Sequence, residues 1–150
     1  MREEKRSDLY EKIDEEDRNL VGEPYISWDL SDAVLKISRG LSIDILRTIQ
    51  VRLQLSNSEL ADILMISPRT LDRRKHEQML PPDESERSYR IVRLIDLAKE
   101  IFASTEKTVV WFKRPNYALG NQRPVELVKT EPGARLVERT LGHIRHGITV

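Results

Sequence analysis

The chain of 150 residues contains no cysteine, which excludes disulfide bonds, cysteine-based zinc sites and thiol catalysis. No apolar run approaches the length that crosses a membrane, and the charged first residues lack the apolar core of a signal peptide. We therefore expect a cytoplasmic protein with no membrane partner. Basic and acidic side chains number 25 each, and this balance argues against a protein that coats nucleic acid non-specifically. It does not argue against a sequence-specific binder with a local basic face.

Recognisable catalytic machinery is also missing. The sequence has no Gly-rich phosphate loop, no nucleophile–base motif and no carboxylate pair in a familiar setting. His143 and His146 would share a helix face, but a metal site would need Glu138 or His76 as a third ligand. Two histidines near a helix end more often act as favourable charges against the helix dipole. We predict no enzyme activity, no cofactor and no metal site.

Apolar residues at helical spacing run along most of the chain, and no alternating run is long enough to indicate a strand. The predicted fold class is therefore all-α. Caps and turn residues place the expected helices as follows: from Ser42 as N-cap; Glu59–Leu64; from Ser67-Pro68; about Glu84–Ala103, behind a capping box of Asp83 and Glu86; Thr108–Phe112; Pro124–Val128; and from Thr130 to Gly147.

These helices fall into three regions. Residues 1–39 form a charged N-terminal extension, in which the stretch from Arg2 to Arg18 is polar enough to favour disorder or a weak helix. Apolar residues between Tyr25 and Ile37 form a patch that could dock on the main body. Residues 40–80 hold a pair of short helices, and residues 81–150 form a helical C-terminal module.

The two short helices between Asn57 and His76 have the pattern of a helix-turn-helix. Ala61 is small where the helices must approach closely, and Leu71 lies on the buried side of the second helix. The other face of this helix carries arginines, which suit the major groove because Arg can bind guanine there. Ser, Thr and Asn side chains can bind the phosphate backbone beside the groove. Arg69 and Arg73 are predicted to face bases. The full set of predicted DNA contacts is Asn57, Ser58, Ser67, Arg69, Thr70, Arg73 and Arg74.

Two residues depart from the usual pattern of this motif. Met65 lies at the turn, where glycine is common because it accepts positive φ. Asp72 lies on the outward face and would repel phosphate unless it meets a cytosine amino group. The alternative interpretation is an ordinary helical hairpin with a solvated basic face.

The segment Trp111-Phe112-Lys113-Arg114-Pro115-Asn116-Tyr117-Ala118-Leu119-Gly120 is followed, in order, by Pro124, Thr130, Gly133 and Gly147. Together these residues resemble the toxin-binding domain of the Xre/MbcA/ParS-type antitoxin family. Gly40-Leu41-Ser42 and the stretch from Leu60 to Leu71 resemble the central helix-turn-helix domain of the same family. The resemblance covers about residues 40 to 150.

This resemblance implies an antitoxin that binds a RES-domain toxin, an enzyme that destroys NAD, and represses its own operon. It also implies a homodimer, or a higher hetero-oligomer with the toxin, on operator DNA. The expected toxin contacts are Trp111, Asn116, Leu119, Gly120, Arg139, Arg145, His146, Gly147, Ile148 and Val150. For Trp111 the alternative is simple core packing. For residues 148–150 the alternative is a frayed chain end. The competing function is a stand-alone repressor with a C-terminal dimerisation or ligand domain.

Overall fold

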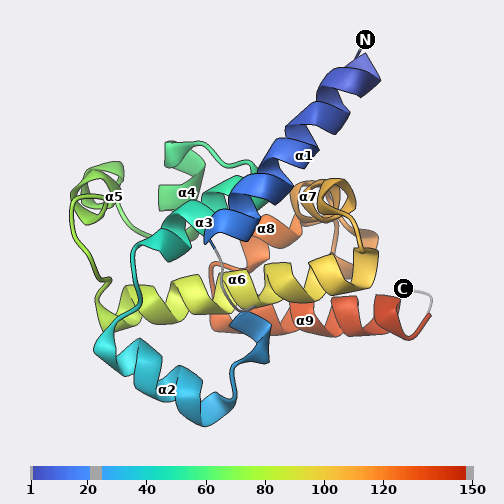
Figure 1. Ribbon diagram of the computed structural model, residues 1–150. Coiled ribbons are helices and arrows are strands. Elements are labelled where there is room, and N and C mark those ends of the chain that lie inside the picture. Colours follow the sequence, from blue (N-terminus) through green and yellow to red (C-terminus); the bar gives the residue numbers. More distant parts are fainter. Residues whose placement is uncertain (1, 21–24, 148–150) are drawn as a thin grey trace.

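The computed structural model describes residues 2–20 and 25–147, and this part of the chain is helical without a β-strand (Figure 1), which confirms the all-α prediction. None of its helices is long and apolar enough to cross a membrane. The elements are α1 Arg2–Leu20, η1 Tyr25–Ser27, α2 Leu30–Arg39, α3 Asp44–Leu53, α4 Asn57–Ile63, α5 Pro68–Arg74, α6 Pro82–Phe102, α7 Thr105–Lys113, η2 Tyr117–Leu119, α8 Pro124–Leu127 and α9 Glu131–Arg145.

Helix α6 is the centre of the fold, as the long apolar face of its sequence predicts. It runs across the molecule between α3 on one side and α9 on the other, with α2 and α7 packed against it (Figure 1). Ile91, Leu94 and Ile95 on α6 are almost wholly shielded from solvent. Burial of several large aliphatic side chains, each contributing about 1.5–3 kcal/mol, makes this helix the main source of stability.

Three of the seven predicted helix starts are confirmed, those of α5, α8 and α9. The Ser67 hydroxyl accepts a hydrogen bond from the Thr70 amide at 3.0 Å, with Pro68 as the first residue of α5. The Thr130 hydroxyl accepts from the Gly133 amide at 3.2 Å at the start of α9. In both helices a side-chain oxygen satisfies one of the amides that the first turn leaves without a partner.

Four predicted starts are wrong. Helix α7 begins at Thr105, behind the N-cap Ser104, and not at Thr108. Helix α3 has Ile43 as its N-cap, and the Ser42 hydroxyl only accepts a 3.3 Å bond from the Asp44 amide. Helix α4 begins at Asn57 rather than Glu59, because Ser56 and Glu59 form the capping box. Helix α6 begins at Pro82 without a side-chain cap, because proline presets the helical φ. The expected box partners bind elsewhere: Asp83 pairs with Arg87 and Glu86 with Arg90.

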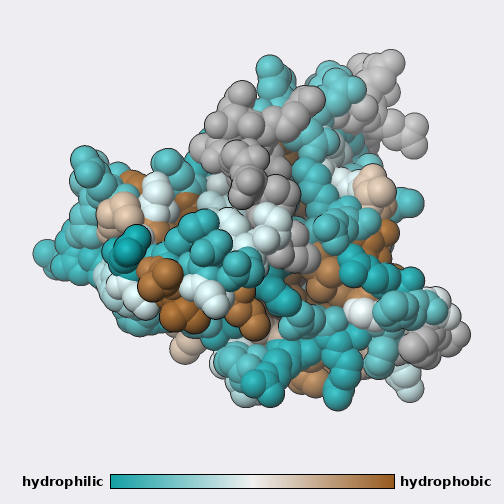
Figure 2. Space-filling view, turned by 60° about the horizontal axis from the view of Figure 1, so that its bottom comes forward, coloured by the Kyte–Doolittle hydropathy of each residue, from teal (hydrophilic) through white to brown (hydrophobic). Residues whose placement is uncertain are grey.

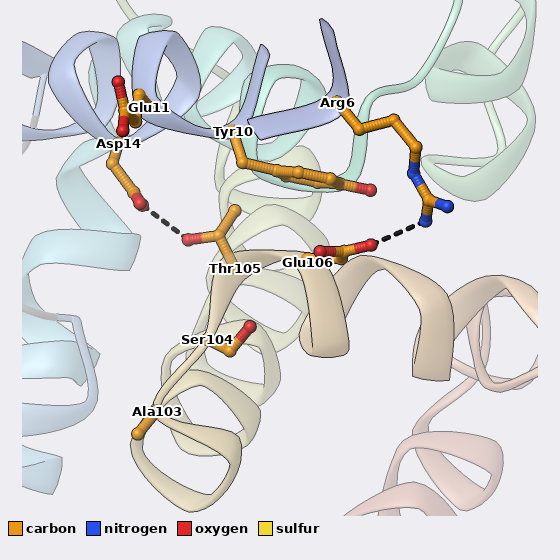
Figure 3. Close-up of a pocket in the computed structure, with 8 residues that line it drawn as sticks. All are labelled: Arg6, Tyr10, Glu11, Asp14, Ala103, Ser104, Thr105 and Glu106. Atoms are coloured by element: carbon orange, nitrogen blue, oxygen red, sulfur yellow. Dashed lines mark hydrogen bonds and ion pairs between the residues drawn. The ribbon is translucent and has the colours of Figure 1, made fainter. Parts of the chain in front are cut away.

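The polar N-terminal stretch is a helix, α1, which lies against α3 and α7 (Figure 1). Ile13 is its buried apolar residue, with 7% of its surface exposed. Charged and polar contacts add to this packing. Figure 3 shows that Arg6 pairs with Glu106 and that Asp14 accepts a hydrogen bond from the Thr105 hydroxyl. Asp14 also pairs with Lys99 of α6. The composition favours either disorder or a weak helix, and the structure has the helix, held by these tertiary contacts.

The apolar patch between Tyr25 and Ile37 docks by only one of its sides. Tyr25, Trp28 and Ile37 pack against the core, and the Trp28 ring stacks on Tyr89 of α6 at 5.6 Å between centroids. Leu30, Val34 and Leu35 instead face solvent. The docking prediction is confirmed for the inner side of α2 and wrong for these three residues.

Candidate functional site

Helices α4 and α5 form a compact pair around buried aliphatic side chains. Leu60, Ala61 and Ile63 of α4 and Leu71 of α5 are all shielded from solvent. The turn between the helices puts Met65 at φ +57°, in the left-handed region that favours glycine. The sequence therefore located the turn correctly, and the residue there holds a conformation that costs about 1 kcal/mol or more.

The outward face of α5 presents two available arginines. The Arg69 side chain is exposed and makes no hydrogen bond or ion pair with the described part of the chain. Arg73 is 65% exposed, and its nearest acidic group, on Glu77, lies 4.0 Å away. The Ser67 and Thr70 hydroxyls are already engaged, because Ser67 donates to Thr70 at 2.9 Å. Arg69 and Arg73 thus have the freedom to reach a ligand.

Arg74 has a different environment from the adjacent Arg73. Its guanidinium donates to both carboxylate oxygens of Glu84, at 2.7 and 3.0 Å, and also pairs with Glu77 at 3.2 Å. The hydrogen bond to Glu84 is the main reason that the pKa of Arg74 is raised. Since the side chain is only 14% exposed, it ties α5 to the start of α6. We therefore withdraw Arg74 from the expected phosphate contacts.

The start of α4 lies next to the end of α5. The Asn57 side-chain oxygen accepts from Gln50 at 2.9 Å and from Lys75 at 2.6 Å, which brings the Lys75 ammonium to this corner. Ser58 is exposed. Asn57, Ser58 and Lys75 therefore add polar and positive groups to the exposed side of the α4–α5 pair.

A second candidate site lies beside Trp111 in the C-terminal module. Trp111 is half-buried, 5.8 Å from Phe102 and edge-on to Phe112 at 5.3 Å between ring centroids. It borders a hollow of about 280 Å³ whose lining contains no acidic residue: Phe102, Lys107, Val110, Trp111, Arg114, Pro115 and Asn116. The exposed side chains of Lys107 and Arg114 have no hydrogen-bond or ion-pair partner within the described residues. The hollow is thus apolar with a cationic rim.

The turn after this hollow is rigid and projects one aromatic ring. Asn116 caps η2 by accepting from the Ala118 amide at 2.9 Å, and Gly120 ends the turn at φ +64°. Leu119 is 7% exposed and anchors the turn in the core, so it cannot contact a partner directly, contrary to expectation. Tyr117 is 85% exposed, and the sequence analysis did not single it out. A solvated tyrosine on a fixed turn has the features of an interface anchor.

The last expected toxin contacts lie at the end of α9. Arg139 is exposed without a partner in the described residues, Arg145 pairs with Glu100 of α6 at 2.8 Å, and His146 is exposed. Gly147 ends the helix at φ +68°, as its sequence position predicts. Ile148 and Val150 lie outside the described residues.

The two candidate sites lie at opposite ends of α6 (Figure 1). Arg74 of α5 binds Glu84 near the start of α6, whereas Arg145 of α9 binds Glu100 near its end. At 1.5 Å per residue these anchor points are about 24 Å apart along one helix. A ligand at one end therefore leaves the other end accessible.

Comparison with known proteins identifies both parts of the chain. Residues 32–93 match the antitoxin Xre-like helix-turn-helix domain, which confirms the helix-turn-helix prediction, and residues 97–147 match the antitoxin Xre/MbcA/ParS C-terminal toxin-binding domain. The fold is similar to a chain in the crystal structure of the M. tuberculosis MbcT–MbcA toxin–antitoxin complex. That likeness has a TM-score of 0.56 at 24% identity and covers 71% of this chain and 95% of the other.

Curated relatives agree with these matches. An antitoxin Xre of Yersinia enterocolitica is 33% identical over 114 residues, which are 75% of this chain and 77% of the relative. An antitoxin Xre of Photorhabdus laumondii is 34% identical over 130 residues, or 85% and 86% of the two chains. A Sphingobium protein named Prs ADP-ribosylating antitoxin is 25% identical over 126 residues, or 77% and 79%. This helical chain therefore belongs to the Xre/MbcA/ParS antitoxin family and is the antitoxin of a toxin–antitoxin system.

Proposed function

We propose that this antitoxin neutralises a RES-domain toxin that degrades NAD, through the C-terminal module, and represses its own operon, through α4 and α5. The observation that carries the proposal is the separation of two cationic sites at the two ends of α6. Such an arrangement lets one chain hold DNA and toxin at once, which a self-regulating antitoxin requires.

The DNA half of the proposal depends on Arg69 and Arg73. Both are exposed on one face of α5, and the opposite face is fixed by Leu71 in the core. A helix held in this way can enter the major groove, where free guanidinium groups bind guanine with two hydrogen bonds. Asn57, Ser58 and Lys75 then lie where the phosphate backbone would pass. One short recognition helix on a chain of zero net charge binds weakly, so the repressor should act as a dimer on two half-sites.

The toxin half depends on the hollow beside Trp111 and on Tyr117. The hollow accepts an apolar side chain, and the unpaired cations Lys107 and Arg114 favour a carboxylate next to it. Tyr117 projects from the adjoining turn and can bury a large ring area at low entropic cost. Arg139, Arg145 and His146 are exposed at the end of α9 and are proposed as further toxin contacts.

An NAD-consuming partner gives the chain end a specific role. The pyrophosphate of NAD is anionic, so a cleft that binds it should be basic, with an apolar wall that Ile148 and Val150 would contact. Gly147, at φ +68°, follows the end of α9. The name of the Sphingobium relative attaches ADP-ribosylation, a reaction that consumes NAD, to the antitoxin and does not name its partner. The absence of catalysis in the antitoxin itself stays a prediction.

The experiment is co-expression with the product of the neighbouring reading frame, followed by co-purification and an NAD-consumption assay. We expect a stable complex that leaves NAD intact. Removal of Gly147 to Val150 should leave the complex assembled but restore NAD loss. If the truncated chain inhibits as fully as the intact one, the broad surface around Trp111 blocks the toxin instead. If no complex forms and no NAD-consuming partner exists, the chain acts as a stand-alone repressor.

A further inference from the structure

Helix α5 carries one acid among its basic residues. Asp72 lies one position before Arg73 and three after Arg69, and all three side chains are exposed. The Asp72 carboxylate makes no hydrogen bond or ion pair with the described part of the chain. Figure 2 shows that the end of the molecule with α5, on the left in Figures 1 and 2, is largely hydrophilic. The carboxylate is therefore open to a polar ligand that the two arginines also reach.

The other acids between residues 57 and 86 are bonded within the chain. They pair as Glu59 with Ser56, Asp62 with Lys129, Glu77 and Glu84 with Arg74, Asp83 with Arg87, and Glu86 with Arg90. Asp72 has basic neighbours three residues away on either side, but Lys75 donates to Asn57 at 2.6 Å and Arg69 leaves it unpaired. No bond to the described residues therefore explains an acid here, and a free carboxylate on this helix repels the phosphates of any duplex.

We propose that Asp72 determines the operator sequence by accepting a hydrogen bond from the amino group of a cytosine. In the major groove cytosine presents this donor, whereas guanine presents the acceptors N7 and O6 and thymine presents the acceptor O4. Adenine presents a donor next to its own N7 acceptor, which repels a carboxylate. Asp72 thus selects cytosine largely by rejecting the other bases. The proposal rests on the DNA half of the proposed function and adds which base the acid reads.

The spacing along α5 suits neighbouring bases. Side chains three residues apart on a helix, such as Arg69 and Asp72, have Cβ atoms about 5–6 Å apart. Successive phosphates of one DNA strand advance by about 3.4 Å along the helix axis. Arg69 can therefore bind a guanine while Asp72 binds the cytosine of the same or the adjacent base pair. Such a pair of contacts adds specificity, while the repulsion of Asp72 from phosphate lowers the affinity for all other sequences.

The test uses the full chain with Asp72→Ala or Asp72→Asn, and Asp8→Asn on α1 as the matched control, since Asp8 is also exposed. Each protein selects duplexes from a pool with a randomised central segment, and the enriched sequences are compared. The wild type and Asp8→Asn should enrich one sequence with cytosine at a defined position of each half-site. Asp72→Ala should lose a preference of about fivefold or more at that position alone, and Asp72→Asn should shift it toward adenine, which an amide can bind with two hydrogen bonds.

Affinity for a random-sequence duplex separates a base contact from a structural role. Asp72→Ala should bind this duplex more tightly than the wild type, with unchanged circular dichroism and melting temperature, because a repelling charge is removed. Weaker binding would overturn the proposal, since it would make Asp72 a support of α5. If the wild type enriches a sequence and both variants keep the same preference at every position, the role of Asp72 is rejected alone. A wild type that enriches no sequence would reject the DNA half of the proposed function, and the role of Asp72 with it.

Discussion

Adjacent helices of this antitoxin use arginine in two different ways. On α5, Arg69 faces solvent without an ion-pair partner among the described residues, and Arg73 meets the Glu77 carboxylate only at 4.0 Å. On α6, Arg87, Arg90 and Arg93 each bind a carboxylate, and Arg74 at the boundary binds Glu84. Both helices are rich in arginine, so the number of basic residues does not distinguish them. We expect the DNA-binding face on α5 because its two arginines are less tightly paired with acids.

The largest expected effect lies where an arginine is buried. Arg52 of α3 pairs with Asp96 of α6, and both side chains are less than a tenth exposed. Asp96→Ala should lower the free energy of unfolding by about 3–5 kcal/mol, because it leaves a buried cation without its partner. Urea denaturation measures this. Glu131→Ala, which breaks the exposed pair with Arg135, should cost less than about 1 kcal/mol; equal costs would contradict the account.

Arg74 and Arg73 give the sharpest contrast, because they are neighbours. Arg74→Ala should lower stability by about 1.5–3 kcal/mol, since it removes hydrogen bonds to a mostly buried carboxylate. Arg73→Ala should change stability by less than about 0.5 kcal/mol. Thermal and urea unfolding of the two variants compare them directly. A similar loss in both would mean that the two arginines are not distinguished by their environments.

Arg73→Ala should act on DNA instead. We expect operator binding to weaken by about 1–3 kcal/mol and the preference for operator over random DNA to relax, because one base contact is lost. Fluorescence anisotropy with operator and scrambled duplexes at fixed salt measures both effects. Unchanged affinity in an Arg69→Ala, Arg73→Ala double variant would remove α5 as the reading helix.

Met65 gives the smallest predicted effect. Met65→Gly should stabilise the fold by about 0.5–1 kcal/mol, because glycine adopts φ +57° without strain and the Met65 side chain is mostly exposed. Met79→Gly is the matched control at an exposed methionine without positive φ, and it should be destabilising. A loss of stability in Met65→Gly would show that the side chain, not the backbone, matters at this turn.

The sequence predicted features that depend on neighbouring residues. Ser67 and Pro68 start α5, Thr130 starts α9, and the apolar face of α6 identifies the core, because caps and periodicity act within a few residues. It could not tell Arg73 from Arg74, since their difference comes from Glu84, which folding brings close. The sequence also did not predict that Leu30 and Val34 are exposed, because the residues of α2 alone do not show which side of the helix packs against α6.

The two candidate sites follow the same division. Turn residues at Asn116 and Gly120 indicated where the η2 turn lies. They did not indicate that Leu119 points into the core while Tyr117 points out, because the direction of a side chain in a short 3₁₀ turn depends on what the turn packs against. The cations Lys107 and Arg114 are separated in the sequence and line one hollow only in the folded chain.

The central claim is that the two ends of α6 carry separate activities, and one crossed experiment tests it. Two double variants, Arg69→Ala with Arg73→Ala and Lys107→Ala with Arg114→Ala, remove the same charge from exposed sites at opposite ends. Each is measured for operator affinity and for toxin affinity. We predict that the first pair loses operator binding and keeps toxin binding, and that the second does the reverse. Equal losses in both assays for either pair would contradict two separate sites.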